Sequence, residues 1–316
     1  MADHTPLVSI CCATYNQVKY VRQCLDGFLK QETNFPFEVL VHDDASTDGT
    51  ADIIREYASK YPDIFLPILQ TENQYQKGNK KITASFNIPR ARGKYIAICE
   101  GDDFWTDPKK LQKQVDFLEA NPEYSLYCHN WSVLCEEKIS DSPVQNLYKQ
   151  PISFTFATLP WVWITKALTL MLRREAVNHE ELLQYSFCRD VHIVYYALKS
   201  GKGYYNPEIM ACYRMHEGGI WSQHDANEKN KTTYLLYKEL YTHEKNKSLR
   251  KRYMNATLAY FNGLAYGKGT WFHIKTNGKL YLESLRNISD FKDVLFCIGG
   301  LVPTAVVKFL MKTFKI

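Results

Sequence analysis

The stretch YIAICEGDDFWTDPKKLQ, residues 95–112, indicates the fold more clearly than any other part of this chain. It begins with the continuous apolar run Tyr95–Cys99, which is typical of a strand buried on both faces. An acidic cluster at residues 100–103 follows at once, and Asp107-Pro108 then starts a helix with proline in its first turn. An apolar strand that ends in carboxylates and leads into a helix is typical of α/β folds.

Two earlier segments repeat this order of an apolar run followed by polar residues. The apolar run of residues 6–14 leads into Thr14-Tyr15-Asn16, and the run of residues 37–42 leads into Asp43-Asp44. Helical apolar spacing follows each run, and Ser46 is placed to cap the second helix. This alternation predicts a parallel, doubly wound sheet. Ligands of such sheets bind beyond the carboxyl ends of the strands, where all three polar clusters would lie.

The later segments are less regular. Residues 83–92 predict a helix, and residues 124–128 and 131–134 predict two strands, which we expect to be antiparallel. Residues 136–166 are poorly patterned. Asp190–Lys199 again has the apolar spacing of a helix.

The carboxylates at the strand ends predict a metal site. Such groups, among them Asp102 and Asp103, repel one another unless a cation joins them, and their hard oxygen atoms suit Mg²⁺ or Mn²⁺. The sequence contains neither GxGxxG nor GxxxxGK[ST], so a glycine-rich loop does not cradle phosphate here. We therefore expect a carboxylate-bound divalent cation to hold phosphate groups.

The net charge of +5 conceals two parts of opposite charge. Residues 245–316 contain 13 Lys or Arg and 3 Asp or Glu, whereas residues 1–244 contain 26 and 31. Residues 294–311 carry the single charge of Lys308, and two glycines and a proline interrupt them. Because a spanning helix needs about 20 apolar residues, we expect residues 292–316 to lie on an anionic membrane surface. A terminal helix packed on the body is the alternative.

The cysteines and the first residues indicate the compartment. The nine cysteines are scattered, odd in number and without a CxxC pair, so they predict neither a disulfide framework nor a structural zinc site. Residues 1–10 lack the basic and long apolar regions of a signal peptide. A hydrophobic content of 45% excludes a disordered chain. Together these features predict a globular protein of a reducing, cytoplasmic compartment.

Four blocks of the sequence carry a family resemblance. They are VSICCATYN (8–16), VLVHDDASTDGT (39–50), YIAICEGDDFWTDPKKLQKQVDFLEANPEYSL (95–126) and YRMHEGG (213–219). In this order they resemble the family-2 glycosyltransferases with the GT-A fold, over roughly residues 6–221. The resemblance implies an α/β, Rossmann-like mixed sheet flanked by helices in residues 1–225. A helical, basic extension would then occupy residues 226–316.

The resemblance assigns the first two blocks to a nucleotide-sugar donor. Thr14, Tyr15 and Asn16 would line the nucleoside pocket. Asp43 or Asp44 would accept a hydrogen bond from the base, which is most often uracil in this family, or from the ribose. Capping of the following helix is the alternative role that the residues alone allow for Asp44.

The third block contains the acidic motif usually written DxD. It corresponds to Glu100-Gly101-Asp102-Asp103, with Glu in place of the first Asp. The resemblance assigns Asp102 to a bound Mn²⁺ or Mg²⁺ and places Glu100 and Asp103 near the donor. Gly101 would let the backbone approach closely.

The resemblance also implies an inverting sugar transfer to a hydroxyl group. Asp190 matches the position of the family's catalytic base, although acidic residues are also common at helix starts. Arg214 would neutralise the diphosphate. His216 would add a metal ligand, with simple packing as the alternative.

The acceptor is expected to be a saccharide, possibly lipid-linked, in the synthesis of bacterial surface polysaccharide. His129, Trp161 and Trp163 are candidate acceptor contacts, with core packing as their alternative. A lipid-linked acceptor would explain a basic, apolar end that holds a cytoplasmic enzyme at the inner face of the cell membrane.

Other functions are less favoured by the residues. A non-catalytic glycan-binding or scaffold subunit would not need intact acidic motifs. A nucleotidyltransferase normally has a glycine-rich basic loop near its first strand, which this chain lacks. Nucleic-acid binding through residues 245–316 is disfavoured, because aromatic residues at helical spacing are more often core and no RNA-binding motif occurs.

Overall fold

The structure, a computed structural model, describes residues 5–160, 162–219, 224–265, 278–280, 282–283 and 286–287. The chain divides into two compact units, residues 1–216 and residues 217–316. Within the described residues, no helix is both long and apolar enough to cross a membrane. Residues 292–316, for which the sequence predicts membrane contact, lie outside the described residues.

One mixed sheet organises the first unit, with strand order β3-β2-β1-β4-β9-β6-β10-β5 and with β7 and β8 paired beside this path. Strands β1, β2, β3 and β4 are parallel, as the alternation predicts. Strand β9 is antiparallel to both β4 and β6, so the sheet is mixed. The strands are β1 (Val8–Thr14), β2 (Phe37–Asp43), β3 (Ile68–Leu69), β4 (Tyr95–Ile98), β5 (Phe104–Trp105), β6 (Tyr124–Cys135), β7 (Lys138–Asp141), β8 (Ile152–Phe154), β9 (Met171–Arg173) and β10 (Lys202–Met215).

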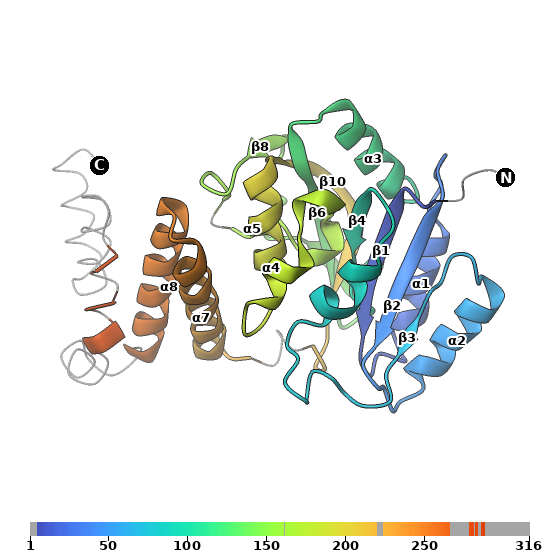
Figure 1. Cartoon of the computed structure of the whole chain (residues 1–316), viewed down its shortest axis with the longest axis horizontal. Helices are drawn as coiled ribbons and strands as arrows, with labels where there is room; N and C mark the ends of the chain where they lie inside the picture. The colour runs from blue at the N-terminus through green and yellow to red at the C-terminus, as the bar shows by residue number, and fades with distance from the viewer. Residues whose placement is uncertain are drawn as a thin grey trace. The chain divides into compact units, whose positions relative to one another are not determined.

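Helices flank this sheet (Figure 1). They are α1 (Val21–Leu29), α2 (Thr50–Lys60), α3 (Lys110–Ala120), α4 (His179–Leu183) and α5 (Asp190–Ser200). The apolar face of α1 is buried against the sheet, and Phe28 meets Trp105 of β5 edge-on with ring centroids 4.7 Å apart. This packing places a solid apolar core beneath the carboxyl ends of β1 and β4.

The helix predicted over residues 83–92 is present, although it is not an α-helix. It consists of a π-helical turn, Thr83–Asn87, and a 3-10 turn, Ile88–Arg90, because Pro89 lacks the N–H that an α-helix would need there. The prediction of two separate strands between residues 124 and 134 was wrong. Residues 124–134 form the single strand β6, since no turn residue interrupts it. Most of β6 pairs in parallel with β10, although β7 and β9 are its antiparallel partners.

The second unit contains two long helices, α7 (Ala226–Glu244) and α8 (Lys247–Ala265). Asp225 and Glu228 form a capping box at the start of α7. Tyr253 and Phe261 of α8 are buried, so these aromatic side chains contribute to packing within the unit.

Candidate active site at the carboxyl ends of the strands

The side chain of Asp43, at the end of β2, is bonded to the loops around it. Thr14 Oγ1 donates to Asp43 Oδ1 at 3.0 Å, and Ser46 Oγ donates to the same oxygen at 2.5 Å. Ser46 N–H donates to Asp43 Oδ2 at 3.0 Å. Ser46 does not cap helix α2, which begins at Thr50 after Gly49. Thr14 and Asp43 are thus in contact, and both carboxylate oxygens of Asp43 accept hydrogen bonds from the protein.

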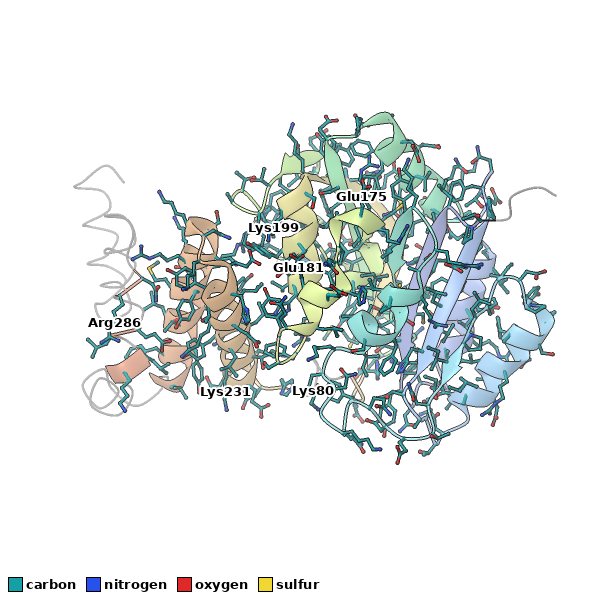
Figure 2. All side chains as sticks on the ribbon, viewed as in Figure 1. Lys80, Glu175, Glu181, Lys199, Lys231 and Arg286 are labelled. Atoms are coloured by element: carbon teal, nitrogen blue, oxygen red, sulfur yellow. The ribbon has the colours of Figure 1, made fainter. Side chains whose placement is uncertain are left out.

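Asp44 anchors the loop that follows β3. The backbone N–H groups of Gln74 and Tyr75 donate to its two carboxylate oxygens at 2.8 and 3.0 Å. Asn73 Nδ2 donates to the Asp44 carbonyl at 3.0 Å. The loop continues to Lys80, labelled in Figure 2, whose Nζ lies 3.4 Å from the centroid of the Tyr75 ring. Helix capping is therefore not the role of Asp44, and its predicted contact with base or ribose stays a prediction.

The residues after β1 form an exposed turn. Asn16 has a φ of 50°, and its side-chain oxygen accepts from Thr47 N–H at 2.9 Å. Its own N–H donates to Ser46 Oγ at 2.8 Å. Tyr15 is 41% exposed, which leaves its ring accessible to a ligand beside this turn.

Three carboxylates converge at the end of β4. Glu100, Asp102 and Asp103 each offer one oxygen, and these oxygens lie within 4.8 Å of one another. Asp102 Oδ1 is buried and has no hydrogen-bond partner among the described residues. An unpartnered buried carboxylate oxygen costs free energy unless a cation or proton joins it. The donor set, three hard oxygen atoms with one left unpartnered, fits Mn²⁺ or Mg²⁺.

Two carboxyl groups of this cluster, those of Glu100 and Asp103, have raised pKa values. Desolvation, followed by the charges of Asp102 and Asp190, raises the pKa of Glu100 to about 7. Glu100 is also exposed to solvent, and the negative charges of the neighbouring carboxylates favour its protonated form. Asp103 is buried, and desolvation together with Asp102 raises its pKa well above the usual range. A bound cation would lower both pKa values.

Gly101 allows β4 and β1 to lie close together beneath this cluster. A Cβ atom at residue 101 would lie 2.4 Å from Thr14 Cγ2 and 2.6 Å from Gln17 Oε1. Among the described residues, the backbone at Gly101 thus lies close to the end of β1 and the turn that follows it.

The end of β10 closes over the acidic cluster. Arg214 N–H donates to Asp103 Oδ1 at 2.8 Å, and its Nε donates to the Asp102 carbonyl at 2.9 Å. Its Nη2 donates to Gln23 Oε1 at 2.6 Å. His216 Nε2 lies 3.1 Å from Asp102 Oδ2. Arg214 therefore holds the acidic loop, and His216 lies where it contacts the predicted metal ligand Asp102.

Asp190, the first residue of α5, belongs to the same site. Its negative charge contributes to the raised pKa of the Glu100 carboxyl. Val191 N–H donates to Asp190 Oδ1 at 2.9 Å, and Trp163 Nε1 donates to Oδ2 at 3.1 Å. Trp163, predicted to contact the acceptor, thus contacts the predicted base. Trp161 lies outside the described residues.

Two cations at this site were missed by sequence reasoning. Lys166 interacts electrostatically with Asp103, Asp190 and Glu100, and Arg189 lowers the pKa of Glu100. Desolvation lowers the pKa of Lys166 itself. Neither residue stands in a recognisable motif, since Lys166 belongs to the poorly patterned stretch.

His129, predicted to contact the acceptor, lies in the interior of the protein. Its side chain is fully buried in β6, and Nδ1 lies 2.6 Å from the Asn130 carbonyl. Burial lowers the pKa of this imidazole well below its usual value. His129, near the middle of a long strand, therefore has no exposed surface that an acceptor could contact.

Relatives of known sequence match the larger part of this chain. The family model described as glycosyl transferase family 2 matches residues 9–179, more than half of the chain. The chain is 40% identical over 215 residues to an uncharacterised protein of Mycobacterium tuberculosis, a match that spans 68% of this chain and 60% of that protein. It is 26% identical over 242 residues to the putative teichuronic acid biosynthesis glycosyltransferase TuaG of Bacillus subtilis, spanning 76% and 90%.

Solved structures share the fold. TarS 1-349 of S. aureus superposes with a TM-score of 0.62 at 15% identity, over 93% of this chain and 80% of that one. Mannosyltransferase PcManGT of Pyrobaculum calidifontis, in complex with GDP-Man and Mn²⁺, gives 0.54 at 17% identity, over 93% and 79%. At these identities the likeness concerns the fold alone, a mixed sheet flanked by helices of the GT-A type. With its acidic strand ends and its matching family model, the chain belongs to glycosyl transferase family 2.

Proposed function

We propose that this chain is a metal-dependent, inverting glycosyltransferase that moves a sugar from a nucleoside diphosphate donor to a hydroxyl of a saccharide. The observation that carries the proposal is the carboxylate group of Glu100, Asp102 and Asp103 beside Asp190. One buried oxygen of Asp102 has no partner among the described residues, as expected of a cation ligand.

The residues divide the chemistry between them. A divalent cation, when bound, supplies a Lewis acid that stabilises the departing diphosphate. Asp102 and Asp103 are the residues to hold it, and His216 lies against Asp102. Asp190 accepts the proton of the acceptor hydroxyl as that oxygen attacks the anomeric carbon from the face opposite the leaving group. Arg214 keeps the acidic loop in position through its bonds to that loop.

A UDP-sugar is the donor that we propose. In this proposal Tyr15 stacks on the base, while Thr14, Asn16 and Asp43 shape the pocket beside it. TarS, which shares the fold, has been solved with UDP-GlcNAc, and PcManGT with GDP-Man. Because these neighbours carry different nucleotides, a panel of donors is needed to test the choice of uracil.

The acceptor is proposed to be a lipid-linked saccharide of bacterial surface polysaccharide, which agrees with the name of TuaG. The 13 basic residues of residues 245–316 favour contact with anionic lipid at the inner face of the membrane. Flotation with phosphatidylglycerol vesicles should carry the full chain upward, and a chain without residues 292–316 should stay below. Equal flotation of both would place the membrane contact elsewhere.

A donor panel tests the enzymatic proposal directly. The full chain would be incubated with UDP-glucose, UDP-GlcNAc and GDP-mannose, each with Mn²⁺ or with EDTA. We expect slow release of nucleoside diphosphate from one donor, with water as acceptor, and no release in EDTA. A chain that releases none from any donor but binds glycans would instead be a scaffold subunit.

A further inference from the structure

Each oxygen of the Asp190 carboxylate accepts one hydrogen bond from the described residues. Val191 N–H donates to Oδ1, a bond local to the start of α5. The second donor, Trp163 Nε1, comes from 27 residues earlier in the chain and bonds Oδ2 at 3.1 Å. A carboxylate oxygen has two lone pairs, so each oxygen keeps capacity for one further donor. An acceptor hydroxyl is such a donor.

The backbone that carries Trp163 is anchored just downstream. Trp105 Nε1 donates to the Leu168 carbonyl at 3.0 Å, and Gln114 Nε2 donates to the Thr169 carbonyl at 3.0 Å. Both bonds are buried and tie this segment to β5 and α3. A side chain that extends from a fixed backbone holds its partner within a narrow range of orientations.

Lys166, in the same segment, brings positive charge to this place. Its Nζ lies 3.4 Å from the centroid of the Tyr213 ring. The carboxylates of Asp103, Asp190 and Glu100 all interact with its charge. Lys166 therefore offsets part of the repulsion between Asp190 and the acidic cluster.

We propose that Trp163 is a positioning residue for the base Asp190, an inference that rests on the proposed function. The indole N–H fixes Oδ2, so the carboxylate presents its remaining lone pairs to the acceptor oxygen instead of rotating about its side-chain bonds. A base has to lie within about 3 Å of the oxygen it deprotonates, so a small misorientation lowers turnover strongly. Binding of the nucleotide-sugar donor does not depend on the orientation of the Asp190 carboxylate.

Trp163→Phe tests the inference, because it keeps a ring and removes the N–H. With the donor that the wild type hydrolyses best among UDP-glucose, UDP-GlcNAc and GDP-mannose, we expect kcat to fall at least about 10-fold, the scale of a hydrogen bond to a charged group. The donor KM and the affinity for the matching nucleoside diphosphate with Mn²⁺, measured by calorimetry, should stay within about 2-fold. Trp163→Gln, which restores an N–H donor without the ring, should recover part of kcat.

Trp131→Phe is the matched control, since Trp131 is buried and its Nε1 has no partner among the described residues. It should leave kcat unchanged. In an Asp190→Asn background, Trp163→Phe should cause no further loss, because the two residues act as one unit.

The outcomes separate this inference from the proposed function. A wild-type chain that hydrolyses no donor would overturn both. An active chain whose Trp163→Phe variant keeps its kcat, or loses donor affinity as much as kcat, would overturn only the role of Trp163. Additive losses in the double variant would do the same.

Discussion

Strands β2 and β4, which flank β1 in one sheet, both lead into carboxylates, but these carboxylates differ in their hydrogen-bond partners. At the end of β2, Asp43 and Asp44 have every oxygen bonded to a hydroxyl or backbone N–H of a nearby loop. At the end of β4, Asp102 Oδ1 is buried without a partner among the described residues, and the pKa of Asp103 is raised by burial and by Asp102. The carboxylate oxygens of the β2 end are thus all bonded within the protein, whereas the β4 end is where we propose that a cation binds.

The difference shows how local donors decide the role of a carboxylate. Backbone N–H groups stabilise the ionised form of a carboxylate, so a carboxylate that receives them can order a loop. At the β4 end Asp103 receives one such N–H, from Arg214, whereas the buried Oδ1 of Asp102 has no partner among the described residues and costs free energy without a ligand. Asp43 is the last residue of β2, whereas Asp102 and Asp103 lie in the loop beyond β4.

The largest effect should come from Asp102→Ala, which removes the unpartnered oxygen of the β4 end. We expect Mn²⁺-dependent binding of UDP or GDP to be lost, because the cation loses its proposed ligand, whereas the fold should be kept. Calorimetry with and without Mn²⁺ measures this. Asp116→Ala, at an exposed position of α3, is the control and should bind like the wild type. Unchanged binding by the Asp102 variant would refute the metal assignment.

Asp190→Asn should have the next largest effect, and on a different quantity. The amide cannot take a proton, so turnover should fall at least about 10²-fold, the scale of general-base catalysis. Donor affinity should be nearly intact, since Asp190 does not belong to the three-carboxylate group. Asp52→Asn, in the first turn of α2, controls for the effect of an acid at a helix start. If affinity and turnover fall together, Asp190 has a structural role.

Sequence reasoning predicted the β4 end better than the loops that complete the site. The apolar run before Glu100 placed the acidic cluster at a strand end, and the structure confirms that position. Bonds such as those from Gln74 to Asp44 and from Trp163 to Asp190 join residues about 30 apart. No local periodicity encodes such bonds, and His129 was misplaced because burial of a polar side chain depends on the whole sheet.

A substitution at the β2 end should lower the stability of the protein instead of its activity. Asp44→Ala would leave the N–H groups of Gln74 and Tyr75 without their acceptor, which costs about 1–3 kcal/mol. We expect this decrease in the free energy of urea unfolding, with faster proteolysis in the loop of residues 70–81. Asp63→Ala, at an exposed position, should change stability by less than about 0.5 kcal/mol. Equal effects of the two variants would mean that Asp44 does not anchor the loop.

The two strand ends also differ in the hydrogen-bond partners of a nearby cationic side chain, Arg90 for β2 and Lys110 for β4. Arg90, behind β2, donates to the carbonyls of Leu66 and Val41 and to Asn87. Lys110, at the start of α3, is fully buried and donates to Gln114 Oε1. Its Nζ also lies 3.9 Å from the Trp105 ring centroid. Lys110 thus has fewer compensating partners than Arg90 among the described residues.

The smallest expected effect is a gain in stability from Lys110→Met. Burial lowers the pKa of Lys110 from 10.5 to about 7. Between those values the unfolded chain binds one proton more than the folded chain, so stability falls as the pH drops toward 7 and stays low beneath it. The methionine keeps the stem without the charge, so it should stabilise the chain by about 1 kcal/mol at pH 6 and by less at pH 9, measured by urea unfolding. Lys113→Met, at a half-exposed neighbour paired with Asp107, should instead lose a few tenths of a kcal/mol. A loss from Lys110→Met that is equal at both pH values would mean that its bond to Gln114 outweighs the cost of burying its charge.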